Sequence, residues 1–158
     1  MALLGAALEC ASQDLPAAVE RLMREREESA KLIKTLLPRI AESEATALLA
    51  AAPPRADGIR VVAQAVQSVA PDYLRHLATA LARTDRTVAL LSDRQAGNVV
   101  FAQHPTVGKD MNALLKKVFE QVPGKGGGSR DFARGALAPG TDPTAAIETA
   151  KTNLWHAD

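Results

Sequence analysis

The apolar positions of this chain change their period along its length, and the change separates a helical segment from a mixed one. From residue 14 to about residue 51, apolar side chains recur every three or four residues, which is typical of an amphipathic helix. From residue 59 onward, short β-branched runs alternate with stretches of helical period. We therefore expect an α+β (mixed α/β) fold, with a long N-terminal helical arm followed by a small mixed β-sheet packed with helices.

The helical arm is predicted to span residues 14–52, after an N-terminal tail at 1–13 for which the pattern predicts no element. Asp14 is a plausible N-cap with Pro16 in the first turn, and Pro53-Pro54 end the helix. The apolar positions follow the alternating spacing of a coiled coil, but Arg26, Ser29 and Ser43 interrupt it. These apolar positions are Leu15, Val19, Leu22, Ile33, Leu36, Ile40, Ala47 and Ala50.

Pro38 lies inside the arm and lacks the backbone N–H that a helix needs at that point. Proline also pushes the preceding residue, Leu37, away from the helical region of backbone space. The sequence leaves two alternatives open, a kinked helix or two separate helices.

The globular part is predicted to span residues 59–157. Strand pairing follows from the connections: a β-helix-β step usually gives a parallel pair, and a short polar turn gives an antiparallel hairpin. The expected order is strand 59–66, helix 71–83, strands 87–92 and 98–103 joined by the turn 93–97, a helix from Asp110 to 122, a glycine-rich loop 123–131, strand 132–137, and a helix that begins at Pro143 after Thr141 or Asp142 and ends near Trp155.

The glycine-rich loop contains four glycines in the five residues Gly124-Lys125-Gly126-Gly127-Gly128. Glycine runs occur where the backbone needs a positive φ or where another group approaches closely. Successive backbone N–H groups can converge on an anion in such a loop. A Walker A motif is excluded because Gly126 follows the lysine where Ser or Thr is required. On the residues alone, a tight packing turn is favoured over a phosphate site.

Charge is concentrated around this loop. The chain carries a net charge of +1, but residues 109–134 contain six cations and three acids, for a local charge of +3. This distribution suits an anionic partner. Only 3% of residues are aromatic, which favours close-packed helices over a large aromatic pocket.

Residues for catalysis or metal binding are scattered. His76, His104 and His156 form no HxxxH or CxxxH pair, and Cys10 is the single cysteine, so we expect no metal site, no catalytic residues and no cofactor. The lone cysteine and the absence of a signal-like or long apolar segment favour a reducing cytoplasm and no membrane contact. Trp155 is expected to fill a gap in the core, with stacking on a base as the alternative.

Around the glycine run the sequence resembles the C-terminal DHH-associated domain of alanyl-tRNA synthetases and of AlaX-type editing proteins. The shared elements are the glycine-lysine run, Asp131, Ala133 and the small pair Gly135-Ala136. That family commonly has Pro where Arg130 stands, Gln for Arg134 and Gly for Ala136. The resemblance covers roughly residues 59–157 and is most specific from Lys109 to Ala136.

The resemblance implies a non-catalytic module that binds tRNA or another RNA and aids dimerisation, with a possible homodimer through the arm. It implies that aminoacylation or editing, if present, lies upstream, so this chain alone should neither hydrolyse mischarged tRNA nor cleave oligonucleotides. The alternative is the C-terminal part of a DHH-type phosphoesterase or of a stand-alone alanyl-tRNA editing hydrolase. The implied RNA-binding residues are Lys109, Lys125, Gly126, Gly127, Gly128, Arg130 and Arg134.

Overall fold

The computed structural model describes residues 15–67, 70 and 72–156. The chain divides into two compact units, one ending at Leu37 and the other beginning at Pro38. The predicted tail, the Asp14 cap, Cys10 and the predicted helix start at Pro71 lie outside the described residues.

Helix α2 (Leu15–Ala51) runs without a break through Pro38, so the predicted alternative of two separate helices is wrong. Proline removes one hydrogen-bond donor, but strong helix formers such as Leu36, Leu37 and Glu42 surround it. A kink at Pro38 stays a prediction. None of the described helices is both long and apolar enough to span a bilayer.

The last turns of α2 contact α3 (Tyr73–Ala82) and its C-cap through side chains within the second unit. Ala41 and Ala45 are buried. Arg83, which caps the C-terminus of α3, donates from Nη1 to Glu42 Oε1 at 2.8 Å, and the buried Tyr73 hydroxyl donates to the Glu44 carboxylate. These contacts bind the final part of the arm to the globular part.

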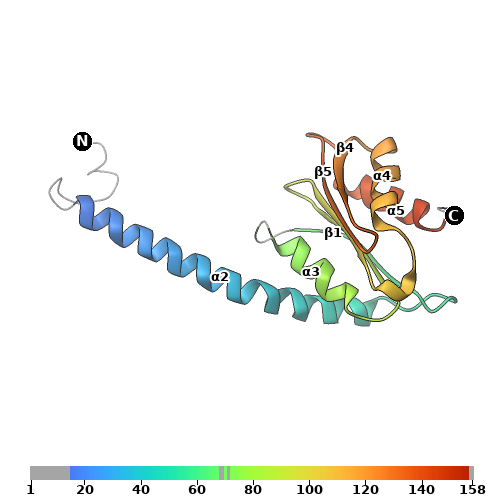
Figure 1. Ribbon diagram of the computed structural model, residues 1–158, viewed down its shortest axis with the longest axis horizontal. Coiled ribbons are helices and arrows are strands. Elements are labelled where there is room, and N and C mark those ends of the chain that lie inside the picture. Colours follow the sequence, from blue (N-terminus) through green and yellow to red (C-terminus); the bar gives the residue numbers. More distant parts are fainter. Residues whose placement is uncertain (1–14, 68–69, 71, 157–158) are drawn as a thin grey trace. The chain divides into compact units, whose positions relative to one another are not determined.

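The second unit contains a five-stranded mixed sheet with the order β1-β2-β3-β5-β4 (Figure 1). Strands β1 and β2 are parallel, and the remaining neighbours are antiparallel. The α+β fold, the parallel first pair and the β2–β3 hairpin are therefore confirmed. The strands are β1 (Arg60–Val66), β2 (Thr87–Asp93), β3 (Asn98–Gln103), β4 (Gly124–Gly128) and β5 (Phe132–Leu137).

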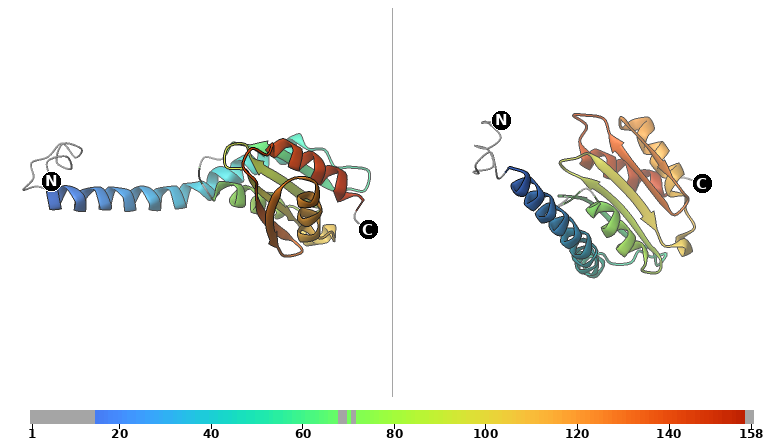
Figure 2. Two further views of the ribbon diagram at one scale, coloured as in Figure 1. Left: turned by 90° about the horizontal axis from the view of Figure 1, so that it is seen from above. Right: turned by 60° about the vertical axis from the view of Figure 1, so that its left-hand side comes forward.

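Helices cover both faces of this sheet (Figure 2). Helix α3 packs on β2 and β3 from one side, while α4 (Met111–Gln121) and α5 (Pro143–Leu154) pack together on the other. All seven residues of β2 are buried, as expected for a central strand with both faces covered. The α4–α5 side forms a continuous core that includes Leu90, Phe101, Leu115, Val118 and Ile147.

Two helix caps confirm the predicted starts of α4 and α5. The Asp110 side chain accepts from the Ala113 N–H at 2.8 Å, and the Asp142 side chain accepts from the Thr144 N–H at 2.8 Å. Asp142, rather than Thr141, is therefore the cap of α5. The short 3-10 helix η2 (Pro105–Val107) before α4 was not predicted.

The glycine run was predicted to be a loop but forms strand β4, the edge of the sheet. None of its glycines has a positive φ. A Cβ on Gly126 would lie 2.4 Å from the Arg134 carbonyl oxygen, and one on Gly128 would lie 2.2 Å from that of Phe132. Close approach to the neighbouring strand, and not a left-handed backbone, therefore explains these glycines.

We predict that Gly126→Ala and Gly127→Ala differ sharply in stability. Alanine at 126 meets a backbone atom that cannot move independently, so a loss of about 1–3 kcal/mol is expected. At Gly127 a Cβ meets only Asn112 Oδ1 at 3.5 Å, and the change should stay within about 0.5 kcal/mol. Urea denaturation of both variants measures the difference. Equal midpoints would show that the strands are not packed this closely.

Candidate nucleic-acid interface

The open edge of β4 presents backbone groups that no neighbouring strand uses. Ser129 N–H donates to Phe132 O at 2.7 Å and Ala138 N–H to Pro123 O at 2.9 Å. In an antiparallel ladder, the backbone groups of alternate residues point toward and away from the partner strand. The N–H and C=O groups of Lys125 and Gly127 therefore point toward β5. The N–H groups of Gly124, Gly126 and Gly128 point away from it. Asn112 Oδ1 accepts from the Gly128 N–H at 3.0 Å. The N–H of Gly126 is thus directed to the outer side of the sheet, where no side chain of its own shields it.

Two predicted cations stand on one face of this β4–β5 hairpin. Lys125 pairs with Ala136, and Arg134 pairs with Gly127. Opposed residues of an antiparallel pair share a face, so Lys125 and Arg134 are diagonal neighbours there. Both side chains are exposed. An anion at this face would meet two positive charges.

At the turn of the hairpin, the Arg130 side chain meets the backbone carbonyls of Gly108 and Lys109. Arg130 donates from Nη2 to Gly108 O at 2.7 Å and from Nε to Lys109 O at 3.2 Å. Arg130 therefore clamps the turn to the loop before α4, which the sequence did not indicate. Its side chain remains exposed, so the guanidinium can serve both as a clamp and as a charge.

A buried glutamine that the sequence analysis missed supports the same junction. Gln103 is only 2% exposed, and its Nε2 donates to Lys109 O at 2.7 Å and to Asp131 Oδ1 at 2.8 Å. In the sequence, the only indication of this role is that Gln103 is a polar residue at the end of an apolar strand. Its partners lie 6 and 28 residues away, which no local pattern reveals.

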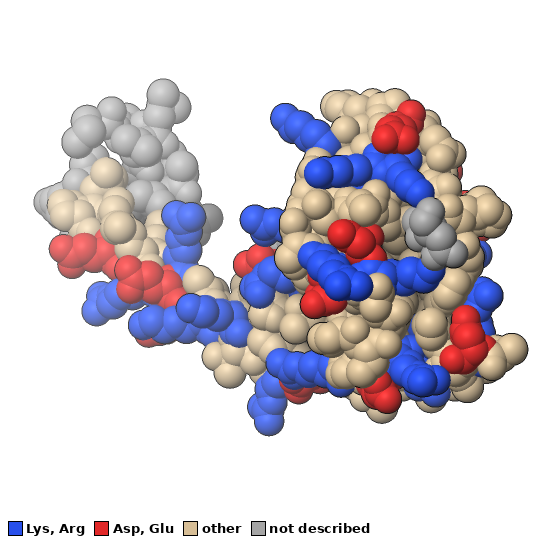
Figure 3. All heavy atoms as spheres, turned by 45° about the vertical axis from the view of Figure 1, so that its right-hand side comes forward, with Lys and Arg blue, Asp and Glu red and all other residues tan. Residues whose placement is uncertain are grey.

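The predicted residues thus fall into two groups, Lys125 and Arg134 along the hairpin and Lys109 and Arg130 at its turn. The surrounding surface is not uniformly basic: Figure 3 shows lysine and arginine side chains across the globular part with acidic groups between them. The open glycine edge, rather than charge density alone, is what distinguishes the hairpin.

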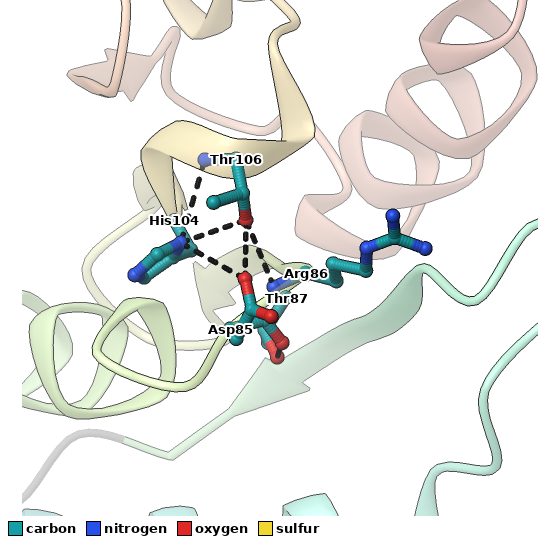
Figure 4. Close-up of polar contacts among 5 residues, drawn as sticks. All are labelled: Asp85, Arg86, Thr87, His104 and Thr106. Carbon is teal, nitrogen blue, oxygen red and sulfur yellow. Dashed lines mark hydrogen bonds and ion pairs between the residues drawn. The ribbon is translucent and has the colours of Figure 1, made fainter.

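A polar cluster joins the start of β2 to η2 (Figure 4). Thr106 Oγ1 lies 2.5 Å from Asp85 Oδ1 and 2.8 Å from His104 Nδ1. The Arg86 N–H donates to the same hydroxyl at 3.2 Å, from a residue with a left-handed φ of 53°. The Thr106 hydroxyl donates to the Asp85 carboxylate, and the Thr106 backbone N–H donates to His104 Nδ1 at 3.4 Å.

This cluster has the features of a scaffold. Its hydrogen bonds join Asp85 and Arg86, which precede β2, to Thr106 of η2. The hydrogen bond from Thr106 lowers the pKa of Asp85 below its usual value, and His104 and Arg86 act in the same direction against desolvation. Among the described residues, no group of three or more His, Cys, Asp or Glu side chains is arranged to hold a metal ion.

The fold and the glycine hairpin define the class of this protein. Residues 58–155 match the DHHA1 domain family, and the chain belongs to it. The resemblance seen in the glycine run is thereby confirmed.

The chain is similar to parts of several known proteins. It is 29% identical over 144 residues to an alanine–tRNA ligase of Methanococcoides burtonii, a match that covers 87% of this chain but only 15% of the ligase. The C-Ala domain of Aquifex aeolicus alanyl-tRNA synthetase is 25% identical, with a TM-score of 0.49 over 59% of this chain and 89% of that domain. RecJ of Thermus thermophilus in complex with Mn²⁺ shares the fold at 15% identity, with a TM-score of 0.58 over 94% of this chain and 20% of RecJ.

We predict that Thr106→Val raises the pKa of Asp85 toward the usual aspartate value, because the largest stabilising contact of the carboxylate is removed. A carboxylate whose pKa is lower in the folded state stabilises the fold at pH values above its unfolded-state pKa of about 3.9. This stabilisation is lost as the pH falls through the folded-state pKa. Thr106→Val should therefore make stability less dependent on pH in that acidic range. An NMR titration of the Asp85 carboxyl carbon measures the shift. Thr106→Ser, which keeps the hydroxyl, should retain the low pKa, and an unchanged titration in the valine variant would contradict the assignment.

Proposed function

We propose that this chain is a non-catalytic module that binds structured RNA, with tRNA as the expected partner, through the β4–β5 hairpin. The observation that carries the proposal is an exposed glycine-rich edge strand, with Lys125 and Arg134 on the hairpin and Arg130 at its turn. Phosphate oxygens accept hydrogen bonds from backbone N–H groups and from Lys and Arg side chains. The edge N–H of Gly126 and the charges of Lys125 and Arg134 together offer both kinds of donor.

The relatives support this partner without establishing it. By its name, the ligase of Methanococcoides burtonii acts on tRNA, but this chain spans 15% of the length of that enzyme. We therefore propose, as a second step, that the chain serves an alanyl-tRNA synthetase or an editing protein in the cytoplasm. A DHH-type phosphoesterase stays the alternative parent, since the likeness to RecJ at 15% identity concerns the fold alone. The coding sequence upstream of this chain decides between these parents. Paired His and Cys residues there would indicate an editing protein, and Asp-His-His clusters would indicate a phosphoesterase.

We predict that Lys125→Ala and Arg134→Ala each weaken tRNA binding and lower the salt slope of the affinity by about one unit, because each removes one phosphate contact. If three or four phosphates are neutralised, wild-type affinity should fall on the order of tens-fold between 50 and 200 mM salt. Fluorescence anisotropy with labelled tRNA across a salt series measures both quantities. Arg83→Ala is the matched control, since this exposed arginine lies at the end of α3 and pairs with Glu42.

Substitutions at Gly127 distinguish an effect of charge on tRNA binding from an effect of side-chain bulk on folding. Space exists for a Cβ at this position, and Gly127 lies directly opposite Arg134. Gly127→Glu should therefore fold but weaken tRNA binding by placing a carboxylate against the arginine, while Gly127→Ala should bind nearly as wild type. If the charge variants and Gly127→Glu all keep wild-type affinity and an unchanged salt slope, the hairpin is architecture and the proposed function fails.

We also propose that α2 pairs two copies of the chain through its apolar face before Pro38. Large apolar side chains are 40–60% exposed there, more than a solvated helix is expected to leave open. Leu22, Ile33 and Leu36 lie on one side of the helix by its 3.6-residue period. The exposed set is Val19, Leu22, Met23, Leu32, Ile33 and Leu36.

We predict that the intact chain is dimeric and that Leu22→Glu with Ile33→Glu makes it monomeric, because two charges then face the apolar contact. Thr35→Glu is the matched control, as residue 35 lies on the opposite side of the helix. Light scattering over a concentration series measures the mass. A monomer at high concentration for the unchanged chain would rule out this pairing.

A further inference from the structure

The end of α5 carries an aromatic ring covered by a cation from a distant turn. Trp155 follows the last residue of α5, and the Arg55 guanidinium carbon lies 4.0 Å from its ring centroid. Lys109 Nζ lies 5.7 Å from the same centroid. Cations within about 6 Å of a tryptophan face are attracted by the electron density of the ring. Trp155 therefore packs against the core, as the sequence predicted, but also displays a cation-covered surface.

Arg55 is held in this position by a short, hydrogen-bonded turn. The Arg55 N–H donates to Ile59 O at 2.9 Å, and the Gly58 N–H donates to Arg55 O at 2.9 Å. Asp57 Oδ2 lies 3.7 Å from Arg55 Nε. The backbone of Arg55 is thus fixed, the Asp57 carboxylate lies beside its guanidinium, and the Arg55 side chain remains 50% exposed. Half of the side-chain surface is therefore accessible in the described part of the chain.

A cavity of about 420 Å³ lies beside this arginine–tryptophan stack. Val61, Ala63 and Leu154 give it an apolar floor, and Arg55 and Lys151 supply positive charge. Its volume falls within the range of about 300–1,000 Å³ for small-molecule sites. An apolar slot with a stacking surface and cations at its edge has the chemistry to take a nucleobase with its phosphate.

The loop before α4 links this cavity to the hairpin. The backbone carbonyl of Lys109 accepts from Arg130 Nε at 3.2 Å, while the Lys109 side chain reaches toward Trp155. A single residue therefore contacts both the hairpin turn and the aromatic surface. An RNA strand that follows the hairpin past Arg130 would meet Lys109 and then Trp155.

From these contacts we infer that the Arg55–Trp155 stack binds one unpaired nucleotide of an RNA strand held on the hairpin. The base stacks on the outer face of the Arg55 guanidinium over the apolar floor, and the phosphate lies toward Lys109 and Lys151. This inference rests on the proposed function and adds a second, base-contacting site to it.

Trp155 is the only tryptophan of the sequence, so its fluorescence reports on this site directly. We expect a short oligoadenylate to quench the Trp155 emission of the full chain, and an abasic oligomer of equal length to leave it unchanged. Adenosine monophosphate should quench only at much higher concentration, because it lacks the hairpin contacts. Quenching by the mononucleotide as strong as that by the oligomer would overturn the RNA-strand assignment in favour of a free nucleotide.

Affinity measurements on variants complete the test. Stacking on one aromatic surface typically contributes a factor of about five to about one hundred in affinity. Arg55→Ala, an exposed change that leaves the core intact, should weaken labelled oligoadenylate by at least the lower factor without weakening the abasic oligomer. Trp155→Leu should do the same, Trp155→Phe should restore part of the loss, and Arg83→Ala should have no effect.

The outcomes for the two sites are distinguishable. If Lys125→Ala and Arg134→Ala reduce tRNA binding but oligoadenylate neither quenches Trp155 nor responds to Arg55→Ala, the hairpin function stands and the nucleotide site is wrong. If quenching occurs but the hairpin variants bind tRNA normally, the proposed function fails instead. Equal loss of the oligoadenylate and the abasic oligomer in Arg55→Ala would show a charge contact without stacking, which also overturns the inference.

Discussion

The close contact between β4 and β5 is the constraint on which the rest of the globular part depends. A strand made of Gly124-Lys125-Gly126-Gly127-Gly128 can approach its neighbour more closely than any strand with side chains, and Cβ atoms at 126 and 128 would overlap the partner backbone. The same closeness admits the ring of Phe119, whose edge lies where Cβ atoms on Gly124 and Gly135 would be, at 2.5 and 2.6 Å. The absence of side chains on these glycines, which the packing requires, also leaves the backbone accessible at the outer edge of β4. A single steric requirement thus produces both the local architecture and the accessible backbone of the candidate interface.

The hairpin gains rigidity from its turn rather than from its glycines. Glycine loses more conformational entropy on folding than other residues, so a strand rich in it needs external support. Arg130 supplies that support by bonding to Gly108 O and Lys109 O, and Gln103 binds the same loop from the buried end of β3. Because these contacts use charged or buried donors, they are stronger than an average exposed hydrogen bond. The arginine that the sequence marked as a binding residue is therefore also part of the frame that positions the others.

The hairpin and the arginine–tryptophan stack share the loop at the centre of this frame. The Lys109 backbone belongs to the hairpin junction, and its side chain lies near Trp155. A change in the conformation of this loop would therefore alter both the hairpin turn and the surface around Trp155. The hydrogen bonds of the Asp85 cluster hold η2 against the start of β2.

The sequence by itself determined the elements, because periodicity and capping are local. The apolar strand Asn98–Gln103, the caps at Asp110 and Asp142 and the strand Phe132–Leu137 all appear where the pattern placed them. It also marked the glycine run as the special segment and allowed close approach as its cause. Only the tertiary structure decided that the run is an edge strand, because the atoms that forbid side chains at Gly126 and Gly128 come from β5 and not from the run itself. The roles of Gln103, Arg130 and Arg55 were decided there too, since each acts on a partner that the folded chain brings close and local sequence does not specify.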